Sequence, residues 1–240
     1  MPNKIVRAPV VTHGKTILGD RMKIFFSMTL LLTLLLLSGK TIAETDEGGV
    51  PVRGWSPFQF SIYSPLQLIG KDKDIAGLRL TLLHGKNVDV SGIDLGLGVN
   101  SSDHLTGIQI SGVANYSYST EGIQIGGLGN EVDYLSGIQI AGISNLVRND
   151  AVGIQIALAA SMVNGTMKGV QISGLNNWLS PTSSSVIGMQ IGLFNYAGNV
   201  KGVQIGIINA CENLSGIQIG ILNYIKQGRF PWFPIINAKF

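Results

Sequence analysis

The chain has 240 residues, of which 45% are hydrophobic and only 13% are charged, and it contains 32 glycines and one cysteine. The single cysteine, Cys211, excludes a disulfide within the chain and a cysteine-based metal cluster. After Ala43 there are 11 basic and 13 acidic residues, so the chain lacks the basic patch that nucleic-acid binding requires.

Residues 1–43 have the pattern of an N-terminal extension followed by a secretory signal peptide. Arg21 and Lys23 precede an apolar run from Ile24 to Leu37, and Thr41 and Ala43 supply the small residues expected before a cleavage site. This order is typical of a signal peptide, so we expect cleavage after Ala43 and export to the cell surface, outer membrane or periplasm. A transmembrane helix is the alternative, although the run is shorter than the ~20 residues that a span needs.

Residues 77–225 form a tandem array of a unit whose core reads Gly-Ile-Gln-Ile or a close variant. Successive copies start 14–16 residues apart, with one step of 19 residues. Most copies end in Asn, and Ser161 replaces this Asn once. Repetition at so constant a spacing indicates a repeat architecture. The copies begin at Gly77, Gly92, Gly107, Gly122, Gly137, Gly153, Gly169, Gly188, Gly202 and Gly216.

Each unit is predicted to fold as short β-strands separated by a bend. Ile108 and Ile110 alternate with Gln109, and alternation with a period of two is typical of a half-buried strand. The number of residues between the core and the terminal Asn changes by one along the array. We expect a bend or bulge at the intervening Gly to absorb the extra residue. The insertion Leu179–Ser185 is expected to be a protruding loop.

Two all-β architectures are compatible with this pattern, and the favoured one is a β-solenoid of about ten coils of 14–16 residues. Stacking in register would place the Ile residues in internal columns, the Gln residues in an external ladder, and the Asn residues at a corner or in an internal ladder. Aromatic segments would cap the array, within an N-terminal cap region of residues 44–76 and a C-terminal cap of residues 226–240.

The alternative architecture is an antiparallel outer-membrane β-barrel, because strands of about 9–11 residues joined by short turns give a similar period. Glycine-rich strands, the signal peptide and the terminal Phe240 fit this alternative. Aromatic residues amount to only 7% and do not recur as girdles at strand ends, which favours the solenoid.

No combination of residues in the sequence indicates catalysis, so we expect a protein without enzymatic activity. His84 and His104 are isolated in predicted turns, and no zinc-protease motif, phosphate-binding loop or cysteine pair is present. The recurrent polar residues are neutral Gln and Asn rather than Asp, which argues against a calcium-binding repeat. We therefore predict no catalytic residue, no metal site and no cofactor.

The recurrent Gln of the repeat is the candidate functional feature. We expect these side chains to form an exposed column, which acts either as a ladder that holds the strands in register or as a binding face. The residues are Gln109, Gln124, Gln139, Gln155, Gln171, Gln190, Gln204 and Gln218.

Tandem Gly-Ile-Gln-Ile-Gly-x-x-Asn units behind a signal peptide resemble the leptospiral-type bacterial surface-repeat proteins, an exported family without established biochemistry. The segments Trp55–Ser61 and Phe230–Asn237 are also similar to that family, so the resemblance covers about residues 50–240. It implies a structural or binding role at the cell envelope or surface, with an unknown surface ligand or envelope partner. Some relatives are lipoproteins, but this chain has no Cys near the cleavage site. An outer-membrane pore or transporter is the alternative function, and outer-membrane association is compatible with both.

Overall fold

The computed structural model describes residues 54–180 and 184–240, and the expected signal peptide lies outside the described residues. Every regular element in this part of the chain is a β-strand. These described residues contain no helix that is long and apolar enough to cross a membrane. The strands are β1 (Trp55–Tyr63), β2 (Leu66–Gln67), β3 (Asp74–Gly96), β4 (Val99–Ser111), β5 (Ala114–Gly126), β6 (Gly129–Ala141), β7 (Ser144–Val147), β8 (Ala151–Ala157), β9 (Ala160–Val163), β10 (Thr166–Ser173), β11 (Asn176–Leu179), β12 (Ser185–Ile191), β13 (Phe194–Ile205), β14 (Ile208–Ile225) and β15 (Trp232–Lys239).

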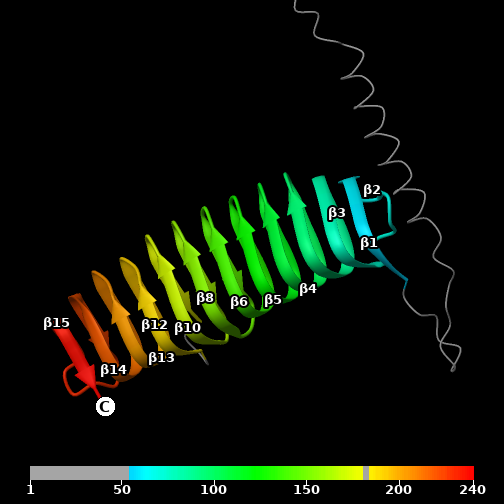
Figure 1. Ribbon diagram of the computed structural model, residues 1–240. Helices are drawn as coiled ribbons and strands as arrows, with labels where there is room; N and C mark the ends of the chain where they lie inside the picture. The colour runs from blue at the N-terminus through cyan, green and yellow to red at the C-terminus, as the bar shows by residue number, and fades with distance from the viewer. Residues whose placement is uncertain (1–53, 181–183) are drawn as a thin grey trace, which may run out of the picture. The chain divides into compact units, whose positions relative to one another are not determined.

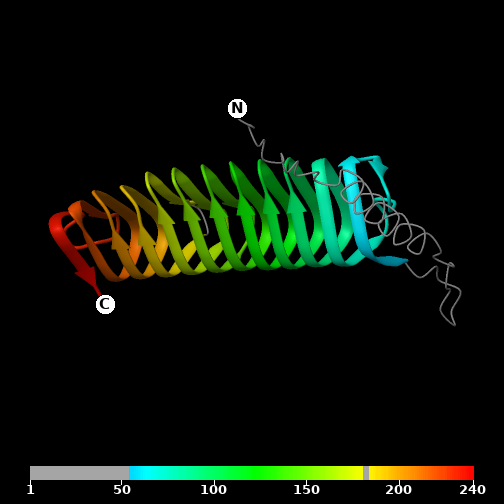
Figure 2. The ribbon, with the colours of Figure 1, turned by 45° about the horizontal axis from the view of Figure 1, so that its top comes forward.

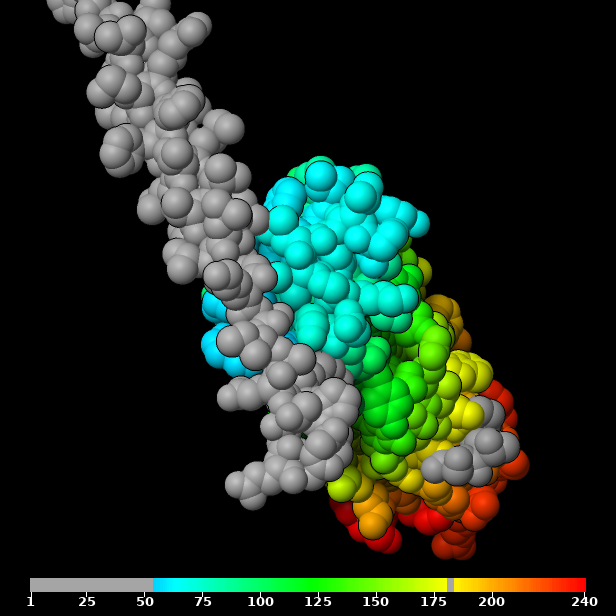
Figure 3. Space-filling view, turned by 90° about the vertical axis from the view of Figure 1, so that its right-hand side faces the viewer, coloured from blue at the N-terminus to red at the C-terminus, as the bar shows by residue number. Residues whose placement is uncertain are grey.

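Successive repeats stack as the coils of a parallel β-solenoid (Figures 1 and 2). Strand β4 pairs in parallel with β5, and β5 pairs in parallel with β6, so that Gln109 lies beside Gln124 and Gln124 beside Gln139. The same one-to-one register continues to the last copy, where β13 pairs with β14. Figure 3 views this stack from its N-terminal end, with the first coils in front. The solenoid prediction is therefore confirmed, and the antiparallel arrangement that the sequence left open is wrong.

Strand β1 is a further coil that the sequence pattern did not reveal. Its segment Pro57–Phe60 pairs in parallel with the first recognised repeat, and Gln59 lies beside Arg79. Gln59 therefore occupies the Gln position of the repeat, with Pro57 in the place of Gly. The region expected to be only a cap thus contains the beginning of the solenoid.

The repeat Gly is required because adjacent coils approach closely at this position. From Gly77 to Gly216 the ten repeat glycines have φ between 125° and 150°, a region that side chains with a Cβ rarely adopt. A Cβ at any of them would lie 1.8–2.3 Å from a carbonyl oxygen of the preceding coil. The invariance of this Gly along the array is thus a consequence of the stacking.

Both ends of the solenoid carry an antiparallel strand. At the N-terminal end β2 pairs with β1, and at the C-terminal end β15 pairs with β14. Ile236 of β15 lies beside Ile219, and Asn237 lies beside Gln218. An antiparallel partner occupies backbone groups that would otherwise be free to pair with another chain.

The Ile residues of the repeat lie on the outside of the solenoid, contrary to the prediction. Ile108 and Ile110 are 38% and 37% exposed, whereas Gln109 between them is completely buried. Leu105 is also buried, and along a strand residues 105, 107 and 109 point to the same side. Since Leu105 faces the core, alternation turns Gln109 inward and both Ile residues outward.

The apolar core occupies the other side of the interior. It is formed by the residue two places before the repeat Gly and by the residue two places after the repeat Asn, such as Leu135 and Val132. The main cluster consists of Val132, Leu135, Val147, Ala151, Val163, Met167, Leu179, Val186, Ala197, Val200, Cys211, Leu214 and Ile225. One half of the interior is therefore apolar, and the half beneath the Ile columns is polar.

Candidate functional site

The eight Gln residues predicted as an exposed face form a buried hydrogen-bonded ladder. All eight are completely inaccessible. Each Nε2 donates to the Oε1 of the Gln one coil earlier, over 2.7–3.0 Å, from Gln218 down to Gln124 and Gln109. The predicted ladder exists, but it is internal, so the Gln side chains cannot serve as a binding face.

The Gln ladder ends on a buried ion pair. Gln109 donates to a carboxylate oxygen of Asp94 over 2.7 Å. Arg79 donates to the same carboxylate from Nε, over 2.8 Å, and from Nη2, over 2.5 Å. Both side chains are completely buried, and Arg79 also donates to the carbonyl oxygen of Ser101. The two degenerate repeats therefore replace two amides of the column with a neutralised pair of charges.

The repeat Asn residues form a second internal ladder that runs in the opposite direction. Asn115 donates to Oδ1 of Asn130, which donates to Asn145, and each also donates to a backbone carbonyl oxygen. The ladder resumes at Asn177 and continues to Asn223. Ser161 interrupts it, and its buried hydroxyl has no hydrogen-bond partner.

With polar side chains inside, the outer surface above the Gln ladder is aliphatic. Three outward columns run along the stack: the first Ile of each repeat, the second Ile, and the aliphatic residue after the bend. We call this surface the aliphatic face. Its columns are Leu78, Ile93, Ile108, Ile123, Ile138, Ile154, Val170, Met189, Val203 and Ile217; Leu80, Leu95, Ile110, Ile125, Ile140, Ile156, Ile172, Ile191, Ile205 and Ile219; and Val113, Leu128, Ile143, Leu175, Leu193, Ile207 and Ile221.

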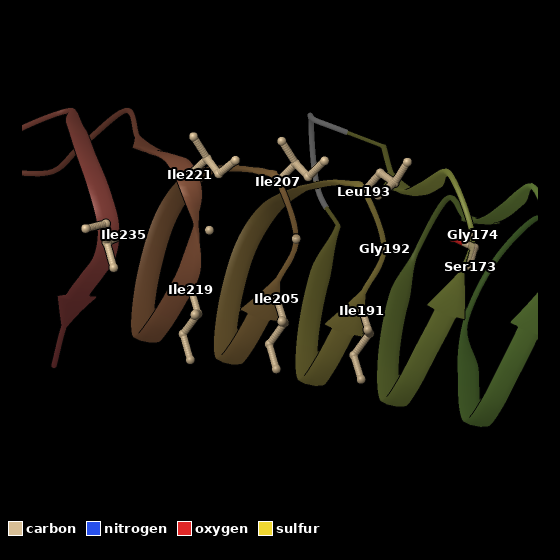
Figure 4. Close-up of a pocket in the computed structure, with 12 residues that line it drawn as sticks. Ser173, Gly174, Ile191, Gly192, Leu193, Ile205, Ile207, Ile219, Ile221 and Ile235 are labelled. Atoms are coloured by element: carbon tan, nitrogen blue, oxygen red, sulfur yellow. The ribbon is translucent and has the colours of Figure 1, made fainter.

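A groove with glycines in its floor separates the second and third columns. Near the C-terminal end it has a volume of about 640 Å³, with Ile205 and Ile219 on one side, Leu193 and Ile207 on the other, and Gly206 between them. In Figure 4 the isoleucines of the second column point away from those of the third. A Cβ on Gly206 would lie 2.2 Å from the carbonyl oxygen of Gly192, so the contact between coils keeps the floor without side chains. The aliphatic face therefore bends around an edge of the solenoid.

Each coil contributes two stretches to the one 15-stranded sheet: the Gly stretch, around the repeat Gly, and the Asn stretch, after the repeat Asn. Charged side chains are unevenly distributed between them. Glu131 and Asp133 lie on the Asn stretch, where both form ion pairs with Arg148. The position immediately before the repeat Gly, which borders the aliphatic face, carries the exposed Lys168 and Lys201 in the C-terminal half. Among the described outward positions of the Gly stretch from Val152 to Ile219, none is acidic. The border of the aliphatic face is thus basic in this half.

The described residues offer no group of three or more His, Cys, Asp or Glu side chains that could hold a metal ion. Cys211 is buried in the apolar core, and burial raises the pKa of its thiol to about 12. The thiol is therefore protonated at neutral pH, and only the thiolate is a nucleophile.

The sequence analysis missed the aliphatic face because it assigned the Ile columns to the interior. The signal that identifies it is the phase of the alternation. Glu121, Lys168 and Lys201 immediately precede the repeat Gly, and charged residues are almost never fully buried without a partner. Counting on by twos from these positions reaches both Ile residues, which places them outside.

Comparison of the chain with protein-family models, curated proteins and solved structures finds no match. Inference about function therefore depends on the chain's own chemistry and geometry.

Proposed function

We propose that the chain is a non-enzymatic repeat protein of the cell envelope or surface, with a structural or binding role in which the aliphatic face is the contact surface. The observation that carries this proposal is the inverted distribution of side chains. The amides of Gln109 and its equivalents are buried, while aliphatic side chains such as Ile108 and Ile110 are exposed. Contiguous apolar patches larger than a few hundred Å² are rare on soluble monomers and are associated with binding sites.

The rigid stack suits a contact role. Parallel strands and two internal amide ladders fix the spacing of the aliphatic columns along the axis. The expected signal peptide of residues 22–43 supports a location in the envelope. A pore or transporter depended on antiparallel pairing of the repeats, and the repeats pair in parallel, so we do not propose it.

Fractionation of cells that express the full chain tests the location. We expect a chain shortened by cleavage after Ala43. It should be recovered either by osmotic shock or with the envelope membranes, which are analysed before and after a carbonate wash. A matched control with Leu32→Arg and Leu35→Arg interrupts the apolar run and should retain the full-length chain in the cytoplasm. A wild-type chain that stays full-length in the cytoplasm would contradict the proposal.

A further inference from the structure

The length and area of the aliphatic face limit the kinds of partner that can cover it. Coils about 4.8 Å apart, each contributing three outward side chains, give the face a length of roughly 40 Å. With more than twenty aliphatic side chains, at exposures such as the 38% and 37% of Ile108 and Ile110, its accessible area exceeds the ~300–600 Å² found for the largest apolar patch of a typical monomer. Phe60 and Ile236 extend the second column by one coil beyond each end of the repeats.

The shape of the face favours a deformable partner over a rigid one. Ile205 and Ile219 point to one side of the groove, and Ile207 and Ile221 point to the other (Figure 4). A flat partner, including a second copy of the chain, would contact the side chains on only one side of the groove and leave those on the other side in water. Hydrocarbon chains of lipids can cover both sides and enter the groove.

The charges at the border of the face indicate which lipids. Lys168 and Lys201 are exposed beside the aliphatic columns, and lysine side chains can extend from an apolar surface toward headgroups. The acidic residues Glu131, Asp133 and Glu212 lie on the Asn stretch, where Arg148 and Lys226 pair with them. Glu121 occupies the same border position in the N-terminal half, so the basic border is confined to the coils from Val152 onward. In those coils, an aliphatic face with a basic border complements an anionic lipid surface.

From these observations we infer that the aliphatic face docks onto an anionic lipid surface, with Ile side chains in the acyl region and Lys168 and Lys201 at the headgroups. This inference rests on the proposed function and names the partner of its contact surface. The solenoid lies along the membrane rather than crossing it, because only one side of its surface is aliphatic throughout.

Binding to vesicles tests the inference on protein purified after expression of the full chain. The probes are vesicles of phosphatidylcholine alone and of phosphatidylcholine with one quarter phosphatidylglycerol. We expect flotation with the anionic vesicles and weaker binding to the neutral ones. Ile156→Glu should weaken binding at least tenfold, since it removes an apolar contact and adds a negative charge. The matched control Tyr116→Glu, on the Asn stretch and similarly exposed, should bind as the wild type does.

Exchange of the border charges tests the headgroup contact separately. Lys168→Glu with Lys201→Glu should weaken binding to anionic vesicles by more than about 25-fold, because each lysine near such a surface contributes about fivefold. The control Lys71→Glu with Lys86→Glu changes the net charge equally at exposed positions away from the face, and should have a small effect. Equal losses in both double variants would overturn the assignment of the border.

A fluorescent label reports contact between the aliphatic face and the vesicle without introducing a charged side chain into the face. Ile156→Cys and Tyr116→Cys are labelled with an environment-sensitive dye, while the buried Cys211 stays unreactive. We expect a blue shift on addition of anionic vesicles at position 156 only. No binding, or a dimer in solution that Ile156→Glu dissociates, would overturn the lipid inference. A chain found in the envelope that nevertheless ignores vesicles would leave the proposed location intact.

Discussion

At the scale of single residues, Arg79 and Asp94 are the two charges in an otherwise neutral polar column. Asp94 accepts hydrogen bonds from Arg79 and from Gln109, so it links the ion pair to the Gln ladder. Within a low-dielectric interior, hydrogen bonds in a chain polarise one another. The Asp94 carboxylate is a charged acceptor for Gln109, the last Gln of the ladder. It is therefore positioned to strengthen the hydrogen bonds between the Gln side chains.

Removal of one charge from this pair should destabilise the fold strongly. Arg79→Gln leaves a buried carboxylate without its counter-charge, and we expect a loss of about 3–5 kcal/mol in the free energy of unfolding. Arg79→Gln with Asp94→Gln removes both charges and extends the amide column, so it should recover at least half of that loss. Urea unfolding measures both variants.

The exposed ion pair between Lys226 and Glu212 supplies the control. Lys226→Gln should cost less than about 1 kcal/mol, because surface pairs contribute little. A double variant at Arg79 and Asp94 that is no more stable than the Arg79 single variant would show that the amide column cannot replace the pair.

At the scale of the structural element, the Asn ladder has a single defect. Asn145 and Asn177 belong to coils on either side of Ser161, and the Ser161 hydroxyl is buried without a partner. The small residue that precedes the bend is Ala157 in this coil and Ala141 in the coil of Asn145. The site therefore has the same small neighbour that accommodates Asn elsewhere.

Ser161→Asn should complete the ladder and stabilise the protein. The new amide would accept from Asn145 and donate to Asn177, and each added hydrogen bond contributes about 1 kcal/mol. The reverse change, Asn130→Ser, should create an equivalent break and destabilise by a similar amount. Thermal unfolding compares the two, and a lower melting temperature for Ser161→Asn would refute a continuous ladder.

The elements could be predicted from the sequence more reliably than their orientation. Spacing alone gave the coils, because in-register stacking requires units of nearly equal length. The spacing did not reveal the coil of β1, because Pro57 and Phe58 replace the Gly and Ile that mark a repeat. The spacing also did not predict that the Gln109 side chain points inward, because the hydrophobic effect normally places Ile inside a protein and an amide outside. The outcome is reversed here because Gln stacks into a ladder that satisfies its own hydrogen bonds.

At the scale of the whole molecule, the solenoid is a linear array in which each coil contacts mainly its neighbours. Stability in such arrays is approximately the sum of the coils and of the interfaces between them. One coil can therefore be removed without loss of the remaining interfaces, provided that the register is preserved. The segment 122–136 begins at one repeat Gly and ends immediately before the next.

Deletion of residues 122–136 should yield a folded protein that is one coil shorter. The deletion joins Glu121 to Gly137, and both ladders can re-form, with Gln139 donating to Gln109 and Asn115 donating to Asn145. We expect the circular dichroism of a β-protein and one cooperative unfolding transition at a moderately lower temperature. Deletion of residues 122–129 removes about half a coil and should prevent folding. It puts Asn130 at the position of the repeat Gly122, where a Cβ would lie 2.0 Å from the carbonyl oxygen of Gly107, and it shifts every later coil out of register. If both deletions unfold the protein alike, the coil is not the independent unit of this fold.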